Sequence, residues 1–164
     1  MTVRRSWDSI VRGWSSSLAE GGLAAATPAL EVLQEILSAA RTIAVVGLSD
    51  KPHRPSHEVA AYLQAEGYRI IPVNPTITQV LGEKSYPSLR DIAEPIDVVD
   101  VFRRAEFVPE IVEDAIVVGA KVVWMQLGIV HEEAAARARA AGLTVVMNTC
   151  MATTHDRLRS MGRL

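Results

Sequence analysis

The 164-residue chain predicts a doubly wound α/β fold, with a five-stranded parallel sheet and an N-terminal helical extension. Strand-like and helix-like segments alternate without a break from Arg41, as in consecutive βαβ units. The expected strands are short and rich in Val and Ile, which is typical of strands buried on both faces. Three expected helices end directly before a strand at Gly67, Gly119 and Gly142, where glycine supplies the left-handed residue that closes a helix.

The elements follow in chain order from the same patterns. The five strands are expected at 42–47, 68–73, 97–102, 121–126 and 143–147. Helices fit at about 55–66, 106–118 and 131–141. Residues 74–96 carry several prolines and are expected to form a long connection with a short helical turn at 88–92.

Residues 1 to about 27 differ in composition from the rest, and residues 1–40 are expected to form a helical extension, with 41–164 as the main domain. Apolar residues recur at helical spacing near the start, namely Val3, Trp7, Val11, Trp14 and Leu18. This helix either packs on its own domain or docks a partner or a second subunit. A second helix is expected from Thr27-Pro28, with an apolar stripe formed by Leu30, Leu33, Ile36 and Leu37.

Composition limits the classes of function. The net charge of −2 and the pI of about 6.1 give no broad basic face for nucleic acid, so any anion site must be local. One cysteine, Cys150, cannot form an internal disulfide framework or a multi-cysteine zinc site. We see no signal-peptide core and no apolar run that spans a bilayer. A cytoplasmic location is therefore expected.

Ligands of open parallel sheets bind beyond the carboxyl ends of the strands, where the strand order reverses. The loop after the first strand, 47–56, leads from that strand into a helix whose free N–H groups suit a phosphate. Gly47 allows the tight turn. Hydroxyls and positive charges come from Ser49, Ser56, Lys51, His53 and Arg54. This loop is expected to bind phosphates.

Polar and basic residues also follow the other strands. Arg103 and Arg104 follow the third strand, where they either clamp phosphates or remain at the surface. Phe102 either covers an adenine ring or packs in the core. Gln126 ends an apolar strand and is expected to bond a ligand or the backbone, and Gly128 allows a ligand close to the backbone.

The loop departs from the dinucleotide-binding fingerprint in two ways. That fingerprint needs G-x-G-x-x-G, whereas this chain has Gly47, Ser49 and Pro52 at the three positions. The second strand ends at Val73-Asn74, with Asn in place of the acid that would hold a ribose hydroxyl. Both departures count against NAD without excluding it.

Several short sequence stretches, spread in a definite order over two-thirds of the chain, form a combined signature. They are AVVGLS at 44–49 with Arg54-Pro55-Ser56, IPVNP at 71–75, YPSL at 86–89, DVVDVFR at 97–103, KVVWMQLG at 121–128 and Cys150. By these stretches the chain resembles the stand-alone CoA-binding proteins of bacteria, which are similar to the CoA-binding domain of the succinyl-CoA synthetase alpha subunit.

The resemblance implies a Rossmann-like coenzyme A site in the main domain. The loop 47–56 would hold phosphates, the residues after the second and third strands would line the adenosine end, and the loop after the fourth would border the cleft. The expected binding residues are Gly47, Leu48, Ser49, Lys51, Arg54, Ser56, Asn74, Pro75, Phe102, Arg103, Arg104, Gln126, Gly128 and Ile129. No catalytic or metal-binding residue is expected.

Three functions remain open at this point. The favoured one is a non-catalytic protein that binds coenzyme A or an acyl-CoA. The second is an NAD(P)-dependent oxidoreductase or redox sensor, in which the arginines would take a 2′-phosphate. The third is an interaction module that docks an acyl-CoA enzyme through the N-terminal helix. A mixed disulfide between Cys150 and the CoA thiol is a further, minor alternative.

Overall fold

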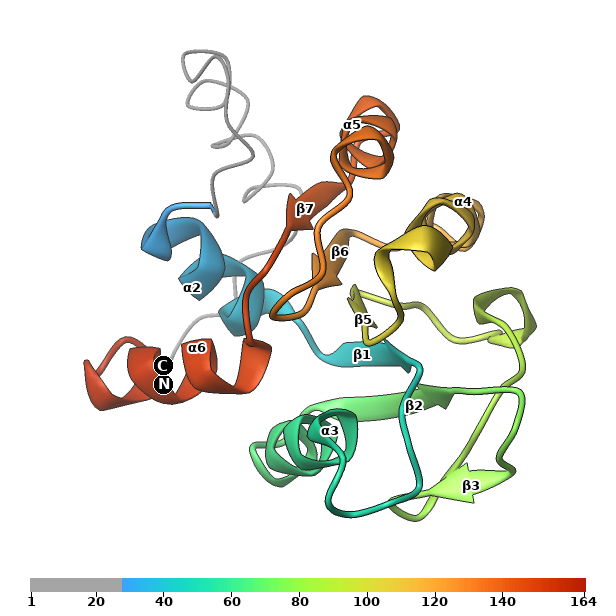
Figure 1. The fold of residues 1–164 in the computed structure, drawn as a ribbon. Coiled ribbons are helices and arrows are strands. Elements are labelled where there is room, and N and C mark those ends of the chain that lie inside the picture. The colour runs from blue at the N-terminus through green and yellow to red at the C-terminus, as the bar shows by residue number, and fades with distance from the viewer. Residues whose placement is uncertain (1–27) are drawn as a thin grey trace.

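A computed structural model describes residues 28–164 and confirms the doubly wound α/β fold (Figure 1). The helix expected over Val3 to Leu18 lies outside the described residues. The main sheet contains five parallel strands in the order β2-β1-β5-β6-β7. These are β1 (Thr42–Val46), β2 (Arg69–Val73), β5 (Val98–Val101), β6 (Val122–Met125) and β7 (Thr144–Val146).

The strand order reverses at β1, which pairs with β2 on one side and β5 on the other. Ala44 of β1 lies between Ile71 and Val99. Each strand is almost entirely buried on both faces, which explains why the sequence reads as Val- and Ile-rich runs rather than as an alternating pattern. The crevice of an open sheet lies at such a reversal.

Helices cover both faces of the sheet (Figure 1). Among the helices of residues 28–164, three pack on one face: α2 (Leu30–Ala39), α3 (Pro55–Ala65) and α6 (Met151–Ser160). Two pack on the other: α4 (Val108–Val117) and α5 (Glu132–Ala140). Positive φ angles at Gly67, Gly119 and Gly142 confirm that glycine closes the helices before β2, β6 and β7.

Three details differ from the expectations. Helix α2 begins at Leu30 rather than at Pro28, with Ala29 as its N-cap residue. Helix α6 was not expected, because its polar sequence offers few apolar residues, yet Met151 and Leu158 are fully buried. The long connection contains a short antiparallel hairpin of β3 (Gln79–Val80) and β4 (Glu83–Lys84).

Two short 3-10 helices complete the fold. The turn expected at 88–92 is confirmed as η1 (Leu89–Asp91), and the Ser88 hydroxyl oxygen accepts a hydrogen bond from the Arg90 N–H there. η2 (Ala105–Phe107) leads from the end of β5 into α4. From residue 28 onward, no helix has the length and apolar character needed to cross a membrane.

Candidate functional site

The candidate site lies at the carboxyl edge of the sheet, where the loops after β1, β2, β5 and β6 meet. Backbone hydrogen bonds hold the first three together: the Gly47 N–H donates to the Val73 carbonyl, and the Phe102 N–H donates to the Val46 carbonyl. A Cβ added to Gly47 would lie 2.7 Å from the Phe102 carbonyl oxygen. Only glycine allows the loops after β1 and β5 to approach this closely.

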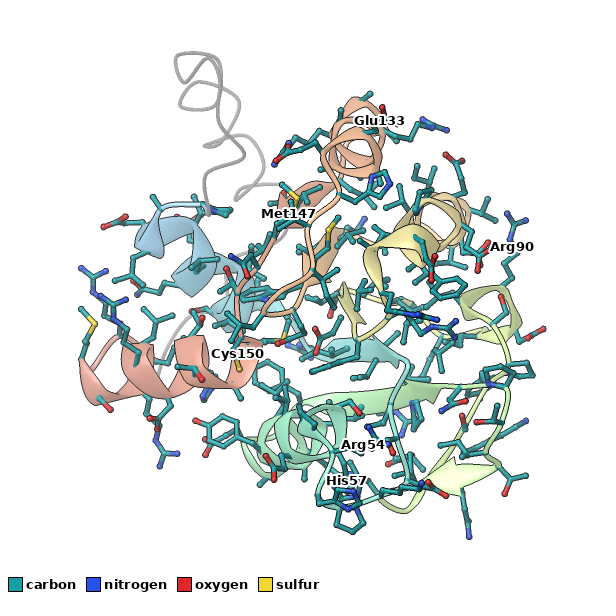
Figure 2. All side chains as sticks on the ribbon, viewed as in Figure 1. Arg54, His57, Arg90, Glu133, Met147 and Cys150 are labelled. Carbon is teal, nitrogen blue, oxygen red and sulfur yellow. The ribbon has the colours of Figure 1, made fainter. Side chains whose placement is uncertain are left out.

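The first cavity has a volume of about 430 Å³ and is rich in polar groups. It is lined by Gly47, Ser49, Asp50, Lys51, Arg54, Pro55, Ser56, Asn74, Thr76, Ile77 and Phe102. Lys51 and Arg54 are both exposed, and Arg54 precedes the first residue of α3, Pro55 (Figure 2). Two cations and the positive end of a helix therefore face one cavity, as an anion site requires.

Hydroxyl groups shape the loop after β1. The Ser56 Oγ accepts a hydrogen bond of 3.0 Å from the Ser49 N–H, and the Ser49 Oγ accepts one of 3.1 Å from the Lys51 N–H. Ser56 is buried, so its main contact is with the loop itself. These bonds fold the loop back onto the start of α3 and leave the Lys51 and Arg54 side chains at its surface.

Asn74 ties the loop after β2 to the loop after β1. Its Nδ2 donates to the Leu48 carbonyl at 3.0 Å, while its Oδ1 accepts from the Thr76 N–H and hydroxyl at 2.9 and 2.7 Å. Leu48 itself is buried in the core beneath α3, so only its backbone lies near the crevice. Pro75 is exposed and lines neither of the two cavities described here.

The second cavity is larger, about 570 Å³, and more apolar. It is lined by Pro55, Val59, Phe102, Arg103, Arg104, Ala105, Gln126, Leu127, Gly128, Ile129 and Cys150. Pro55 and Phe102 line both cavities, so the two are adjacent at the point where the strand order reverses. Cys150, the N-cap residue of α6, lines the second cavity, whereas Arg54 lines the first (Figure 2).

The two arginines after β5 differ in their surroundings. The Arg103 guanidinium lies 4.1 Å from the centre of the Phe107 ring, a cation–π distance. The Arg104 side chain is 82% exposed and lies 3.4 Å from a Glu106 carboxylate oxygen. Arg103 is therefore held in a fixed position beside Gly47, whereas Arg104 is at the solvent end of the cavity.

A buried carboxylate lies behind the second cavity. Asp100, in the middle of β5, is fully buried, and its Oδ1 accepts a hydrogen bond of 2.6 Å from Gln126 Nε2. Within residues 28–164, its Oδ2 has no hydrogen-bond partner. Burial raises the pKa of Asp100 to about 7, against the opposing effect of the bond from Gln126. The Gln126 Oε1 accepts from the Met151 N–H at 3.4 Å, which links the network to the start of α6.

Sequence reasoning missed several of these residues. Asp50, Thr76 and Ile77 line the first cavity, and Val59 lines the second. Thr76 is recognisable in retrospect, because Asn followed two residues later by Thr is typical of an Asx turn. Asp100 is also recognisable as a charged residue within a Val-rich strand, although its partner Gln126 lies 26 residues away.

Residues 41–156 match the model of a protein family described as the CoA binding domain. The chain belongs to the CoA binding domain family. An uncharacterized protein of Bacillus subtilis (strain 168), YneT, is 47% identical over 128 residues, which are 78% of this chain and 95% of that one. The resemblance on which the coenzyme A prediction was based is therefore confirmed at the level of the family.

One solved structure and one part of a larger enzyme are also similar to this chain. A hypothetical protein from Pyrococcus horikoshii OT3 has a TM-score of 0.77 and 45% identity, covering 84% of this chain and 94% of that one. An ADP-forming acetate–CoA ligase II of Archaeoglobus fulgidus is 31% identical over 83 residues, which are 49% of this chain and 12% of the ligase. The match to the ligase concerns only a small part of that enzyme.

Proposed function

We propose that this CoA binding domain protein binds coenzyme A or an acyl-CoA without catalysing a reaction, and that the loop after β1 holds the phosphates. The observation that carries the proposal is the first cavity, where Lys51, Arg54 and the start of α3 face one polar space. Charged hydrogen-bond donors at a helix N-terminus are the common means of binding phosphate groups.

The residue that follows β2 favours coenzyme A over NAD. Asn74 stands where an acid would hold the ribose of NAD, and its side chain is already bonded to Leu48 and Thr76. A purely binding role is supported by the surroundings of His155, the histidine nearest to Cys150 in the sequence. Its Nδ1 lies 2.9 Å from the Tyr62 hydroxyl, so this histidine already has a partner away from the cavity.

Calorimetric titration of the protein with CoA, dephospho-CoA and NAD⁺ tests the proposal. We expect CoA to bind, dephospho-CoA to bind more weakly because it lacks the 3′-phosphate, and NAD⁺ not to bind. Arg54→Ala should weaken CoA binding roughly 10- to 100-fold, the scale of one charged hydrogen bond. Arg139→Ala removes an exposed arginine from α5 and serves as the control. A preference for NAD⁺, or equal affinities of both variants, would contradict the proposal.

A further inference from the structure

The second cavity differs in chemistry from the first. Apolar side chains line much of its wall, among them Val59, Phe102, Leu127 and Ile129. Two arginines also line it: Arg103 stacks on the Phe107 ring, and Arg104 lies beside Glu106 at the solvent end. Its volume of about 570 Å³ lies within the range of roughly 300–1,000 Å³ of small-molecule sites. A ligand that extends from the polar cavity past Phe102 therefore enters largely apolar surroundings.

Several polar groups of this wall are engaged by the protein itself. The Gln126 amide bonds Asp100 through Nε2 and the Met151 N–H through Oε1. The Gly128 N–H donates to the Asn148 Oδ1 at 2.7 Å. An uncharged polar group placed against this side of the cavity would thus lose its bonds to water without gaining equivalent ones, which costs free energy. An apolar group loses nothing there and gains from burial.

We propose that the second cavity is an acyl subsite, which takes the apolar acyl group of an acyl-CoA thioester. This inference rests on the proposed function, because it needs the nucleotide of the same molecule in the first cavity. Leu127 supports it: this side chain is 72% exposed at the cavity wall, where an acyl chain would cover it. The physiological ligand is then a thioester with an aliphatic acyl group, rather than free CoA.

Affinities for a series of thioesters test the acyl subsite. We expect Kd to fall from CoA through acetyl-CoA and butyryl-CoA to hexanoyl-CoA, by roughly two- to fourfold for each buried methylene. Succinyl-CoA, whose acyl group ends in a carboxylate, tests the alternative that Arg103 and Arg104 of this cavity bind a charged acyl group. Equal affinities across the series, or tightest binding of succinyl-CoA, would overturn the acyl subsite while leaving CoA binding in place. Absence of binding by every ligand would instead overturn the proposed function.

Cys150 provides an independent readout of where the acyl group lies. It is the only cysteine of the chain, is partly exposed and lines the second cavity. Its rate of alkylation by N-ethylmaleimide therefore reports on the occupancy of that cavity. At matched saturation, hexanoyl-CoA should slow alkylation at least severalfold more than acetyl-CoA does, since both thioesters lack a free thiol that would consume the reagent. Equal protection by both ligands would contradict the placement of the acyl group.

A pair of exposed apolar residues supplies variants that keep the fold. Leu127→Ser changes a residue of the acyl subsite and is the test variant. Val117→Ser is the control: it changes a side chain of α4 that is 61% exposed and lies outside the two cavities. We expect Leu127→Ser to reduce the ratio of the CoA and hexanoyl-CoA dissociation constants by about threefold or more. Val117→Ser should leave this ratio unchanged. An unchanged ratio in both variants would exclude Leu127 from contact with the acyl chain and contradict the subsite as described.

Discussion

Replacing Gly47 by alanine tests the close approach of the loops after β1 and β5. Gly47 has a φ of +88°, a left-handed conformation that costs other residues roughly 1–2 kcal/mol. The new Cβ would lie 2.7 Å from the Phe102 carbonyl oxygen, so the backbone after β5 has to move. Overpacking of this kind adds roughly 1–3 kcal/mol. Gly47→Ala should therefore lower the free energy of unfolding by about 2–5 kcal/mol.

Gly142→Ala is the matched control for this substitution. Gly142 has a φ of +91°, but a Cβ there would meet no atom within 4 Å. Its replacement should cost only the backbone strain, about 1–2 kcal/mol. Urea unfolding followed by circular dichroism measures both values. Equal losses in the two variants would refute the reasoning, because they would show that Phe102 and Gly47 do not crowd each other.

Three further substitutions test contacts around the site and on the face opposite α4 and α5. Asp100 should contribute a fall in stability of about 3 kcal/mol as pH rises from 4 to 7, because unfolded Asp100 loses its proton near its usual pKa of 3.8 while folded Asp100 keeps it to about 7. Asp100→Asn should remove this slope in urea unfolding across that range. Ser56→Ala removes the acceptor of the Ser49 N–H and should cost about 1 kcal/mol and weaken CoA binding. Burial lowers the pKa of His155, so its contribution to stability is present above pH 6.5 and is lost as pH falls below it. His155→Gln should therefore lower Tm more at pH 7.5 than at pH 5.

Each of these three predictions has an experimental outcome that would contradict it. A pH slope retained in Asp100→Asn would mean that other groups produce it. If Ser56→Ala unfolds like the wild type, the serine does not hold the loop after β1. A loss of Tm in His155→Gln that is the same at both pH values would show that protonation of His155 is not linked to folding.

The sheet could be predicted from the sequence because its signals are local. Runs of Val and Ile with glycines at 67, 119 and 142 define buried strands and helix ends without reference to distant residues. Helix α6 was missed because Met151 and Leu158 alone carry its burial. Its packing depends on α2 and α3, which lie far away in the chain.

The candidate site was predictable as an edge of the sheet rather than as a set of side chains. Strand ends identify the loops, but not the direction in which a residue points: Leu48 turns into the core, and Pro75 lies outside both cavities. The division into a polar and an apolar cavity depends on Val59 of α3 and on Cys150, which precedes α6. The boundary at residue 40 and the contacts of the fourteen expected binding residues with a ligand stay predictions.

The bonds that Gly47, Asn74 and Phe102 make between neighbouring loops also bear on how fast a ligand can bind. Ordering a free residue costs roughly 1–2 kcal/mol, and here this entropy is lost during folding rather than on binding. A rigid crevice needs no slow rearrangement before it accepts a ligand, so we expect association at rates typical of preformed sites. Differences in affinity between related thioesters should then reside in how long each one stays bound.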